Sequence, residues 1–354
     1  MVIFRILFPL IFSVALAGFL CRANAAAETS KPPEDQFAFH LEQTKKGLRP
    51  LKLTEAPVVT ASAKIYFTFY GISFKGIRHY LGTFSSGSYD LAAQIFLPPD
   101  ARATVFLLHG YLDHSGNLKH LIDLCLRQRY AVAVYDLPGH GLSGGASCSI
   151  DDFSEYVSVL DDFLRMCRSH LPGPYYFVGH STGSAIGIDY LHRVNPKAFD
   201  RVVYVAPLVR SAYWTISKAH HYLAKPFIET VPRVFFDNSS DPKFNRFLKD
   251  DPLQCKEIPL KWIAALFAWN ERVERLQPIS RPVLILQGTE DTVVDWEYNI
   301  VFLQQKNNLA KVKWLPKGKH HLLNETQIIR EEVLKAVRDY FQSSLSEPNN
   351  SGSE

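Results

Sequence analysis

The chain lacks the features that mark several protein classes. Its 354 residues contain no run of like charges, and the net charge is only +4, so nothing indicates nucleic-acid binding. None of its five cysteines forms a C-x-x-C pair, which argues against a zinc or dithiol redox site. Cys125 and Cys167 lie in apolar, helix-like patterns and are expected to be buried thiols, whereas no particular disulfide is predicted.

The glycine-rich stretch from Asp136 to Gly145 lacks the signatures of a phosphate-binding loop. It has neither the Lys-Ser/Thr ending of a P-loop nor the spacing of a dinucleotide-binding fingerprint. We interpret it as a structural loop and expect no cofactor and no metal in the protein's chemistry.

The first 25 residues are typical of a signal peptide. Arg5 precedes an uncharged apolar run from Ile6 to Leu20, and Ala23-Asn24-Ala25 is a small-x-small cleavage site. We expect export to the periplasm or the exterior, with an uncleaved membrane anchor as the alternative. Residues 26–60 are predicted to be a loosely held polar leader, and residues 343–354 a disordered tail.

Between these ends, apolar runs alternate with helix-like periodicity. A strand pair is expected at 78–84 and 89–97, and helices at 118–129, 153–170 and 328–341. Further strands are expected at 103–108, 131–135, 175–178, 201–205, 282–287 and 312–315. This alternation predicts an α/β fold with a mostly parallel, doubly wound sheet, whose core spans residues 61–207 and 279–342.

Residues 208–278 interrupt this alternation. They are rich in aromatic residues, show helix-like periodicity around 262–273 and contain no clear strand. We expect an inserted helical lid over the carboxyl edge of the sheet, where ligands of such folds bind. Most of the aromatic side chains should form the lid's own core and a few should line an apolar pocket. Transient contact of the lid with a membrane surface is also predicted.

The sequence around Ser181 indicates a nucleophile. Gly179-His180-Ser181-Thr182-Gly183 follows a strand pattern and precedes a helix pattern, which is the context that makes G-x-S-x-G meaningful. A serine hydroxyl needs a base to accept its proton and a third group to orient that base.

Both partners follow in the chain order of this fold: serine, acid, histidine. Asp291 lies on the loop after the strand at 282–287 and is the preferred acid. Asp295 is its competitor, although Asp295 could instead cap the following helix. After the last strand, His320 and His321 stand together as candidate bases.

Two backbone N–H groups should stabilise the oxyanion of the reaction. Thr182 follows the nucleophile and supplies the first, and Tyr111, on the loop after the strand at 103–108, is the best candidate for the second. Nearby His109 and His114 are expected to hold that loop by hydrogen bonds.

In order and spacing, these motifs resemble the α/β-hydrolase superfamily, and within it the monoacylglycerol lipase / lysophospholipase-like (serine aminopeptidase S33-like) group. The matching pieces are His109-Gly110…His114-Ser115-Gly116, Asp136…Gly139-His140-Gly141…Ser143, Gly179-His180-Ser181-Thr182-Gly183, Gly288…Asp291…Val294-Asp295, Gly318…His320…Leu322…Glu325, and Asp251-Pro252-Leu253 in the lid. The resemblance aligns His320, not His321, with the catalytic histidine. Two positions depart from the group's pattern. Thr182 stands where the group often has methionine, and Tyr111 stands where it often has a small residue.

The resemblance implies a serine hydrolase that cleaves carboxylic esters, in particular lipid monoesters such as monoacylglycerols or lysophospholipids, through an acyl-enzyme at Ser181. A small-ester esterase or a peptidase of the same fold is the alternative among enzymes. From another class, the alternative is a catalytically silent protein that binds a hydrophobic ligand. The sequence predicts no oligomeric state.

Overall fold

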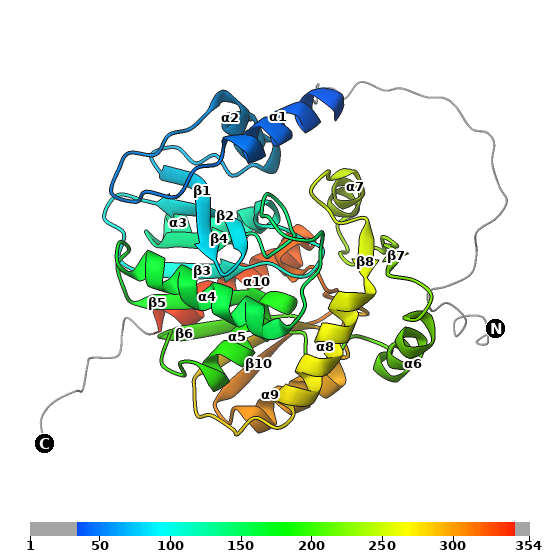
Figure 1. Cartoon of the computed structure of the whole chain (residues 1–354). Coiled ribbons are helices and arrows are strands. Elements are labelled where there is room, and N and C mark those ends of the chain that lie inside the picture. The colour runs from blue at the N-terminus through cyan, green and yellow to red at the C-terminus, as the bar shows by residue number, and fades with distance from the viewer. Residues whose placement is uncertain (1–33, 344–354) are drawn as a thin grey trace, which may run out of the picture.

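The predicted strands form a single eight-stranded sheet. The computed structural model describes residues 34–343, and the strand order is β1-β2-β4-β3-β5-β6-β9-β10 (Figure 1). The strands are β1 (Arg78–Ser86), β2 (Tyr89–Leu97), β3 (Thr104–Leu108), β4 (Ala131–Tyr135), β5 (Tyr175–His180), β6 (Arg201–Val205), β9 (Val283–Gly288) and β10 (Ala310–Leu315). β2 pairs antiparallel with β1 and β4, and all other neighbours are parallel, which confirms the predicted sheet.

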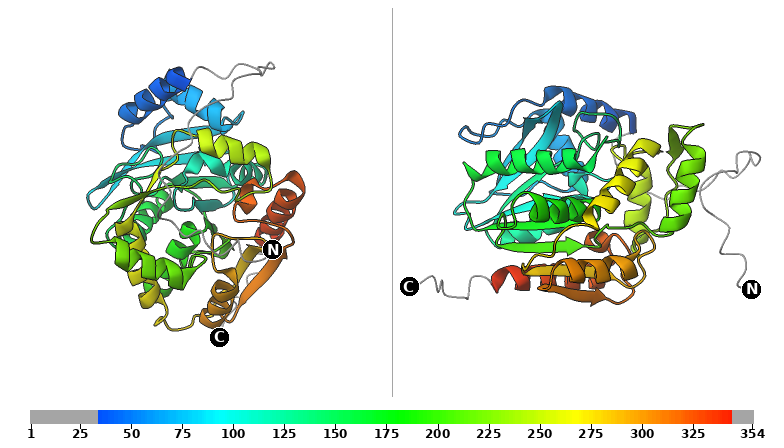
Figure 2. Two further views of the ribbon diagram at one scale, coloured as in Figure 1. Left: turned by 90° about the vertical axis from the view of Figure 1, so that its right-hand side faces the viewer. Right: turned by 60° about the horizontal axis from the view of Figure 1, so that its bottom comes forward.

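Helices cover both faces of the sheet (Figure 2). One apolar core joins the sheet to α4 (Phe153–Arg168), α5 (Thr182–Arg193), α8 (Leu260–Val273) and α9 (Trp296–Lys306). A second core on the other face joins it to α1 (Glu34–Gly47), α2 (Ala61–Tyr70), α3 (Lys119–Arg127) and α10 (Gln327–Gln342). The central strands β3 and β4 are buried along their whole length, as expected of a doubly wound sheet with two covered faces.

The polar leader is not loosely held in its described part. Residues 34–60 contain helix α1 and an extended segment that bridges to Thr83 at Pro50. Phe37 and Leu41, one turn apart on α1, are buried, and the Phe37 ring stacks on Phe69 of α2 with centroids 3.8 Å apart. These two buried side chains anchor the segment to the second core.

The predicted signal peptide (1–25) and the start of the leader lie outside the described residues, as does the tail from residue 344. Within residues 34–343, no helix combines the length and apolarity needed to cross a membrane.

The chain between β6 and β9 forms the lid (residues 208–278), which lies at one end of the sheet (Figures 1 and 2). It contains α6 (Trp214–Ala224), α7 (Pro242–Asp250) and α8. The expectation that this region has no strand is wrong, because β7 (Thr230–Pro232) pairs antiparallel with β8 (Glu257–Pro259). These strands are three residues each, too short for an alternating apolar pattern to reveal them.

The cysteines divide into two kinds. Cys125 and Cys167 are free and buried, as predicted, and burial raises the pKa of both thiols. Cys148 and Cys255 form a disulfide that spans 107 residues of sequence and fastens the lid to the loop after β4.

Candidate active site

Ser181 occupies a sharp turn between strand β5 and helix α5. Its φ of +51° is a conformation that residues with a side chain rarely adopt. The turn depends on its flanking glycines: a Cβ on Gly179 would come within 2.5 Å of the Gly183 backbone, and one on Gly183 within 2.5 Å of the Leu108 carbonyl oxygen. Strain at one residue, supported by close backbone packing on both sides, is typical of a nucleophile on a strand–turn–helix junction.

His320 and Asp291 form a buried hydrogen-bonded pair. His320 Nδ1 lies 2.9 Å from Asp291 Oδ2. Both residues follow parallel strands, β10 and β9, so they lie at the same sheet edge as Ser181. The carbonyl oxygen of His320 accepts a hydrogen bond from His180 Nε2 at 3.1 Å, which places the loop of His320 against the residue before Ser181.

The carboxylate of Asp291 is held ionised. Burial opposes its charge, but the neighbouring His320 and the backbone N–H groups of Val293 and Val294 outweigh burial and lower the pKa of Asp291. Its Oδ1 accepts those two N–H groups at 2.9 and 3.2 Å, while Oδ2 faces the histidine. An ionised carboxylate on Nδ1–H orients the ring so that Nε2 can accept a proton.

The competing candidates have other positions. Asp295 caps helix α9 by accepting the Tyr298 N–H at 3.2 Å. Glu290 is exposed. His321 is buried beside His320, with ring centroids 5.8 Å apart, and makes no contact with Asp291 that would orient it as a base. Of the alternatives left open by the sequence, the structure pairs only Asp291 with His320.

The loop after β3 lies directly against the serine. A Cβ on Gly110 would come within 3.2 Å of Ser181 Cβ and 3.0 Å of His180 Nδ1, so only glycine fits without displacement. Thr182 is the first residue of α5, where a backbone N–H has no partner within the helix. Among the described residues, the Tyr111 N–H likewise has no acceptor. One unpaired donor is thus on the residue after Ser181, and the other is on the residue after Gly110, which packs against Ser181.

The side chain of Tyr111 ties this loop to the lid. Its ring stacks on Trp262 of α8 with centroids 3.5 Å apart and an angle of 8° between the planes. Its hydroxyl donates to the Cys148 carbonyl oxygen at 2.7 Å, next to the disulfide with the lid. Tyr111, where the group often has a small residue, thus connects the loop after β3 to the lid.

His109 and His114 hold the loop by hydrogen bonds, as predicted. His109 Nε2 accepts the Leu137 N–H at 2.9 Å, and Nδ1 lies 2.8 Å from the Gly110 carbonyl oxygen, which together fix a neutral ring. His114 Nε2 lies 2.8 Å from Oδ2 of Asp251 in the lid.

The His114–Asp251 pair is fully buried, and its electrostatics favour an ion pair. Burial opposes charge on both groups, but their mutual attraction outweighs it, raising the pKa of His114 to about 9 and lowering the pKa of Asp251. The Gly116 N–H lies 3.2 Å from His114 Nδ1, and a protonated Nδ1 cannot accept a hydrogen bond, so the charged ring requires this contact to open. Tyr70 also donates to Asp251, at 2.6 Å, so the pair joins helix α2, the loop and the lid.

The glycine-rich stretch is a structural loop, as interpreted. Asp136 accepts the Ser115 N–H and the Leu142 N–H, each at 2.8 Å, and so joins the loops after β3 and β4.

Glu325 is a buried residue whose role the sequence did not reveal, although it lies in the quoted motif around His320. Its carboxylate accepts the Lys319 N–H and, from the lid, the Ser240 N–H, both at 2.9 Å. It therefore fixes the start of the His320 loop. An isolated glutamate after a histidine carries no pattern that would predict this contact.

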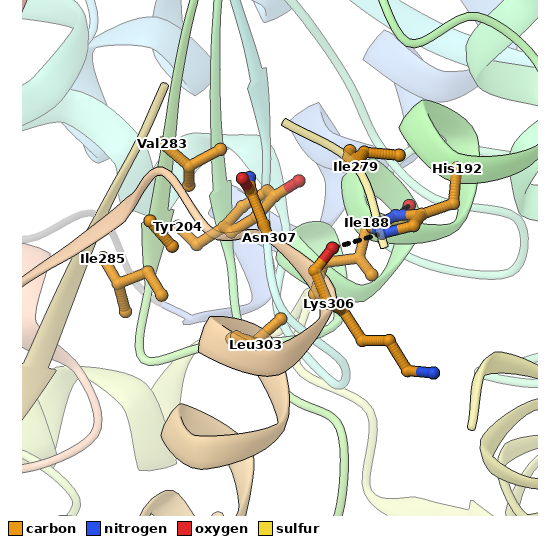
Figure 3. Close-up of a pocket in the computed structure, with 10 residues that line it drawn as sticks. Ile188, His192, Tyr204, Ile279, Val283, Ile285, Leu303, Lys306 and Asn307 are labelled. Atoms are coloured by element: carbon orange, nitrogen blue, oxygen red, sulfur yellow. Dashed lines mark hydrogen bonds between the residues drawn. The ribbon is translucent and has the colours of Figure 1, made fainter. Parts of the chain in front are cut away.

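A small cavity elsewhere in the protein is distinct from this site. It lies between α5, α9 and the amino ends of β9 and β10, at the sheet edge opposite Ser181 (Figure 3). His192 Nε2 lies 3.3 Å from the Lys306 carbonyl oxygen at its margin, and the remaining lining is mainly apolar. No member of the Ser181 constellation lines it.

Comparison with known proteins supports the resemblance inferred from the motifs. The model of the family "Serine aminopeptidase, S33" matches residues 99–327. The chain belongs to this family of α/β-hydrolases. The matched region begins just before β3 and contains Ser181, Asp291, His320 and the whole lid.

Relatives of this S33 family member include several lipases. A monoglyceride lipase homolog from monkeypox virus is 28% identical over 249 residues, covering 68% of this chain and 89% of its own length. The monoglyceride lipase of Rattus norvegicus is 25% identical, covering 69% and 84%. Phospholipase YtpA of Bacillus subtilis is 24% identical, covering 67% and 94%. The prediction of a carboxylic-ester hydrolase of the lipase-like group is therefore confirmed at that level.

Solved structures show the same fold. A soluble variant of monoglyceride lipase from Saccharomyces cerevisiae, in complex with a substrate analog, aligns with a TM-score of 0.66 at 18% identity, covering 77% of this chain and 97% of its own. The monoacylglycerol lipase of Paleococcus ferrophilus aligns with a TM-score of 0.62 at 23% identity, covering 72% and 98%.

Proposed function

We propose that this S33 family member hydrolyses lipid monoesters, monoacylglycerols or lysophospholipids, through an acyl-enzyme at Ser181. The observation that carries the proposal is the strained Ser181 turn at the same sheet edge as the buried His320–Asp291 pair. A serine, a histidine and an acid so arranged perform nucleophilic acyl transfer on unrelated folds.

In this mechanism Ser181 Oγ attacks the ester carbonyl carbon while His320 Nε2 takes the hydroxyl proton. The oxyanion accepts hydrogen bonds from the Thr182 and Tyr111 N–H groups. His320, kept in the required tautomer by Asp291, then donates the proton to the leaving alcohol. Water, deprotonated by His320, attacks the acyl-enzyme, and the carboxylic acid leaves as Ser181 regains its proton.

The exposed side chains of the lid support the proposal of a lipid substrate. Its segment from residue 213 to 236 carries large apolar side chains that are more than half exposed: Tyr213, Tyr222, Leu223, Phe227, Val234 and Phe236. Ser181 itself is only 6% exposed. We propose that the exposed apolar face rests on a membrane or micelle surface and brings lipid monoesters to the site.

This contact predicts a lipid-dependent binding change. Replacing Phe227 and Phe236 by serine should reduce co-sedimentation with phosphatidylcholine vesicles while leaving hydrolysis of a soluble short-chain ester intact. Equal sedimentation of the variant and the wild-type protein would contradict membrane contact through the lid.

We further propose that the protein is exported by its first 25 residues. The Cys148–Cys255 disulfide supports an oxidising compartment. Amino-terminal sequencing of the protein expressed in its host should find a chain that starts near Ala26. A chain that keeps residues 1–25 in the membrane fraction would instead support the anchor.

The test of function is hydrolysis of p-nitrophenyl esters from two to sixteen carbons, followed by monoolein and lysophosphatidylcholine, with Ser181→Ala as the blank. Activity that peaks at medium or long chains and vanishes in the variant supports a lipid monoester hydrolase. Activity on only the shortest esters favours a small-ester esterase or a peptidase. The absence of any Ser181-dependent activity would favour a silent binder of hydrophobic ligands.

A further inference from the structure

Three buried side chains beside the Ser181 constellation have no assigned part in its chemistry. Asp113 lies on the loop after β3, two residues beyond Tyr111, His180 precedes Ser181, and His321 follows His320. One ligand atom of each lies within 4.8 Å of the others. Asp113 and His321 lie on loops, His180 is the last residue of strand β5, and all three are buried. We call them the Asp113 cluster.

We propose that the Asp113 cluster is a binding site for a Zn²⁺ ion that inhibits the hydrolase. Two imidazoles and a carboxylate are a donor set that zinc accepts, and three protein ligands leave a fourth position for water. Ligand atoms about 2.1 Å from a tetrahedral ion lie about 3.4 Å apart, so small side-chain rotations would close the present separations.

His180 is prepared as a ligand by its surroundings. Its Nε2 lies 3.1 Å from the carbonyl oxygen of His320, an acceptor that requires the proton on Nε2. The lone pair is then on Nδ1, which lies beside Gly110: a Cβ on Gly110 would come within 3.0 Å of this nitrogen. A second hydrogen bond that fixes the tautomer is the usual arrangement of a metal-bound histidine.

Asp113 is oriented in a similar way. Its Oδ1 accepts hydrogen bonds from Asn117 Nδ2 at 2.7 Å and from Gln254 Nε2, in the lid, at 3.2 Å. Both donors approach the same oxygen, so Oδ2 is left for an ion. Such support of a carboxylate by outer hydrogen bonds is common around metal sites.

His321 is the member of the cluster whose ring has no hydrogen-bond role within the described part of the protein. It is 8% exposed, and its ring contacts His180 and Phe244 with centroids 5.4 and 5.3 Å away. Among the residues that the structure describes, its ring has no hydrogen-bond partner. Neither ring nitrogen is among the fully buried atoms that lack a partner, so each keeps some contact with solvent. The unprotonated nitrogen of this ring is therefore free to bind an ion.

Inhibition follows from the position of the cluster, and this part rests on the proposed function. The His180 and His320 ring centroids are 5.0 Å apart, so a divalent cation would lie close to the proposed base. That base must become an imidazolium during the reaction, and the nearby positive charges would repel each other. The ion would also fasten together the three segments that carry the proposed nucleophile, base and oxyanion donor.

The experiment measures zinc binding to the whole oxidised chain by isothermal titration calorimetry, and ester hydrolysis at increasing zinc. His321→Phe keeps an aromatic ring against His180 and Phe244 but removes the ligand atoms. His170→Phe is the matched control, because His170 is exposed and remote from the cluster. Thermal unfolding confirms that each variant is folded.

We expect one zinc ion per chain, at least tenfold weaker binding in His321→Phe and in Asp113→Asn, and unchanged zinc binding in His170→Phe. Zinc should lower the hydrolysis rate at least tenfold, relative to each protein's zinc-free rate, in the wild type but not in His321→Phe. Equal binding by wild type and His321→Phe would overturn the proposal, as would the absence of stoichiometric binding.

Two control measurements complete the experiment. His140, Cys148 and Cys255 form a second cluster of donor atoms, but the disulfide occupies both sulfurs. Zinc binding that occurs only after reduction would assign the ion there and refute the Asp113 cluster. Ser181→Ala should bind zinc as the wild type does, so binding is measurable even if no ester is hydrolysed.

Discussion

Replacing Asp291 by asparagine tests how this carboxylate acts, because its two oxygens have different partners. Oδ1 accepts the N–H groups of Val293 at 2.9 Å and Val294 at 3.2 Å. Oδ2 faces His320 Nδ1 at 2.9 Å and Gln287 Nε2 at 3.2 Å. Two backbone donors require an oxygen at the first position, so the amide nitrogen of an asparagine must take the second.

The consequence is the wrong tautomer of His320. An amide nitrogen donates to Nδ1, which must then be unprotonated, and the ring proton moves to Nε2. Nε2 can no longer accept the proton of Ser181. The same change in a serine-protease triad lowers kcat about 10⁴-fold, and since each factor of ten is about 1.4 kcal/mol, the barrier should rise by about 5 kcal/mol.

The assay is kcat on a soluble p-nitrophenyl ester, with Asp295→Asn as the matched control. Asp295 only caps helix α9, and asparagine caps a helix about as well as aspartate, so this variant should keep its activity within about twofold. Thermal unfolding confirms that both variants are folded. The reasoning is refuted if Asp291→Asn keeps more than a tenth of the wild-type kcat, or if Asp295→Asn suffers the larger loss.

Three other changes probe the supports of the site. Asp251→Asn should lower the free energy of unfolding by about 3–5 kcal/mol. Because the pKa of Asp251 is lowered, the stability that Asp251 contributes is lost in acid. Because the pKa of His114 is raised to about 9, the stability that His114 contributes is lost as the pH rises through 9. The variant's deficit in urea unfolding should thus be largest between about pH 4 and 6.5, and a deficit independent of pH would contradict the ion pair. Gly183→Ala places a Cβ 2.5 Å from a β3 carbonyl oxygen, so it should lower both activity and the midpoint of thermal unfolding, and an unaffected enzyme would refute the close packing. Trp262→Ala removes the stack on Tyr111 and should reduce kcat more than it changes KM, whereas an effect on KM alone would indicate that the stack serves only binding.

Much of the fold could be predicted because its strands are locally distinctive. Runs such as Val105-Phe106-Leu107 and Val132-Ala133-Val134 are buried on both faces, so the sequence there is continuously apolar. Helix α1 was not predicted because it shows little apolar periodicity. Among its residues whose burial is described, the buried apolar side chains are Phe37 and Leu41, and the ring partner of Phe37 lies on another helix. The Cys148–Cys255 pairing escaped because a separation of 107 residues carries no local signal.

The residues of the site likewise divide into those that the sequence could predict and those that it could not. Ser181, Asp291 and His320 each follow a strand of a parallel sheet, so chain order and strand ends were enough to bring them to one edge. The contact between Tyr111 and Trp262, and the ion pair of His114, depend on how the lid folds back over the loop after β3. The path of the lid is set by packing among segments distant in sequence. The periodicity of a single segment carries no information on that packing.

Covalent labelling bears most directly on the proposal that Ser181 is the nucleophile of an ester hydrolase. The wild-type protein and Ser181→Ala are incubated with a fluorophosphonate probe, and the intact mass and the labelled peptide are determined by mass spectrometry. We predict one adduct per chain, located on Ser181, and none in the variant. Equal labelling of the two proteins, or a folded wild-type protein that takes no label, would contradict the proposal.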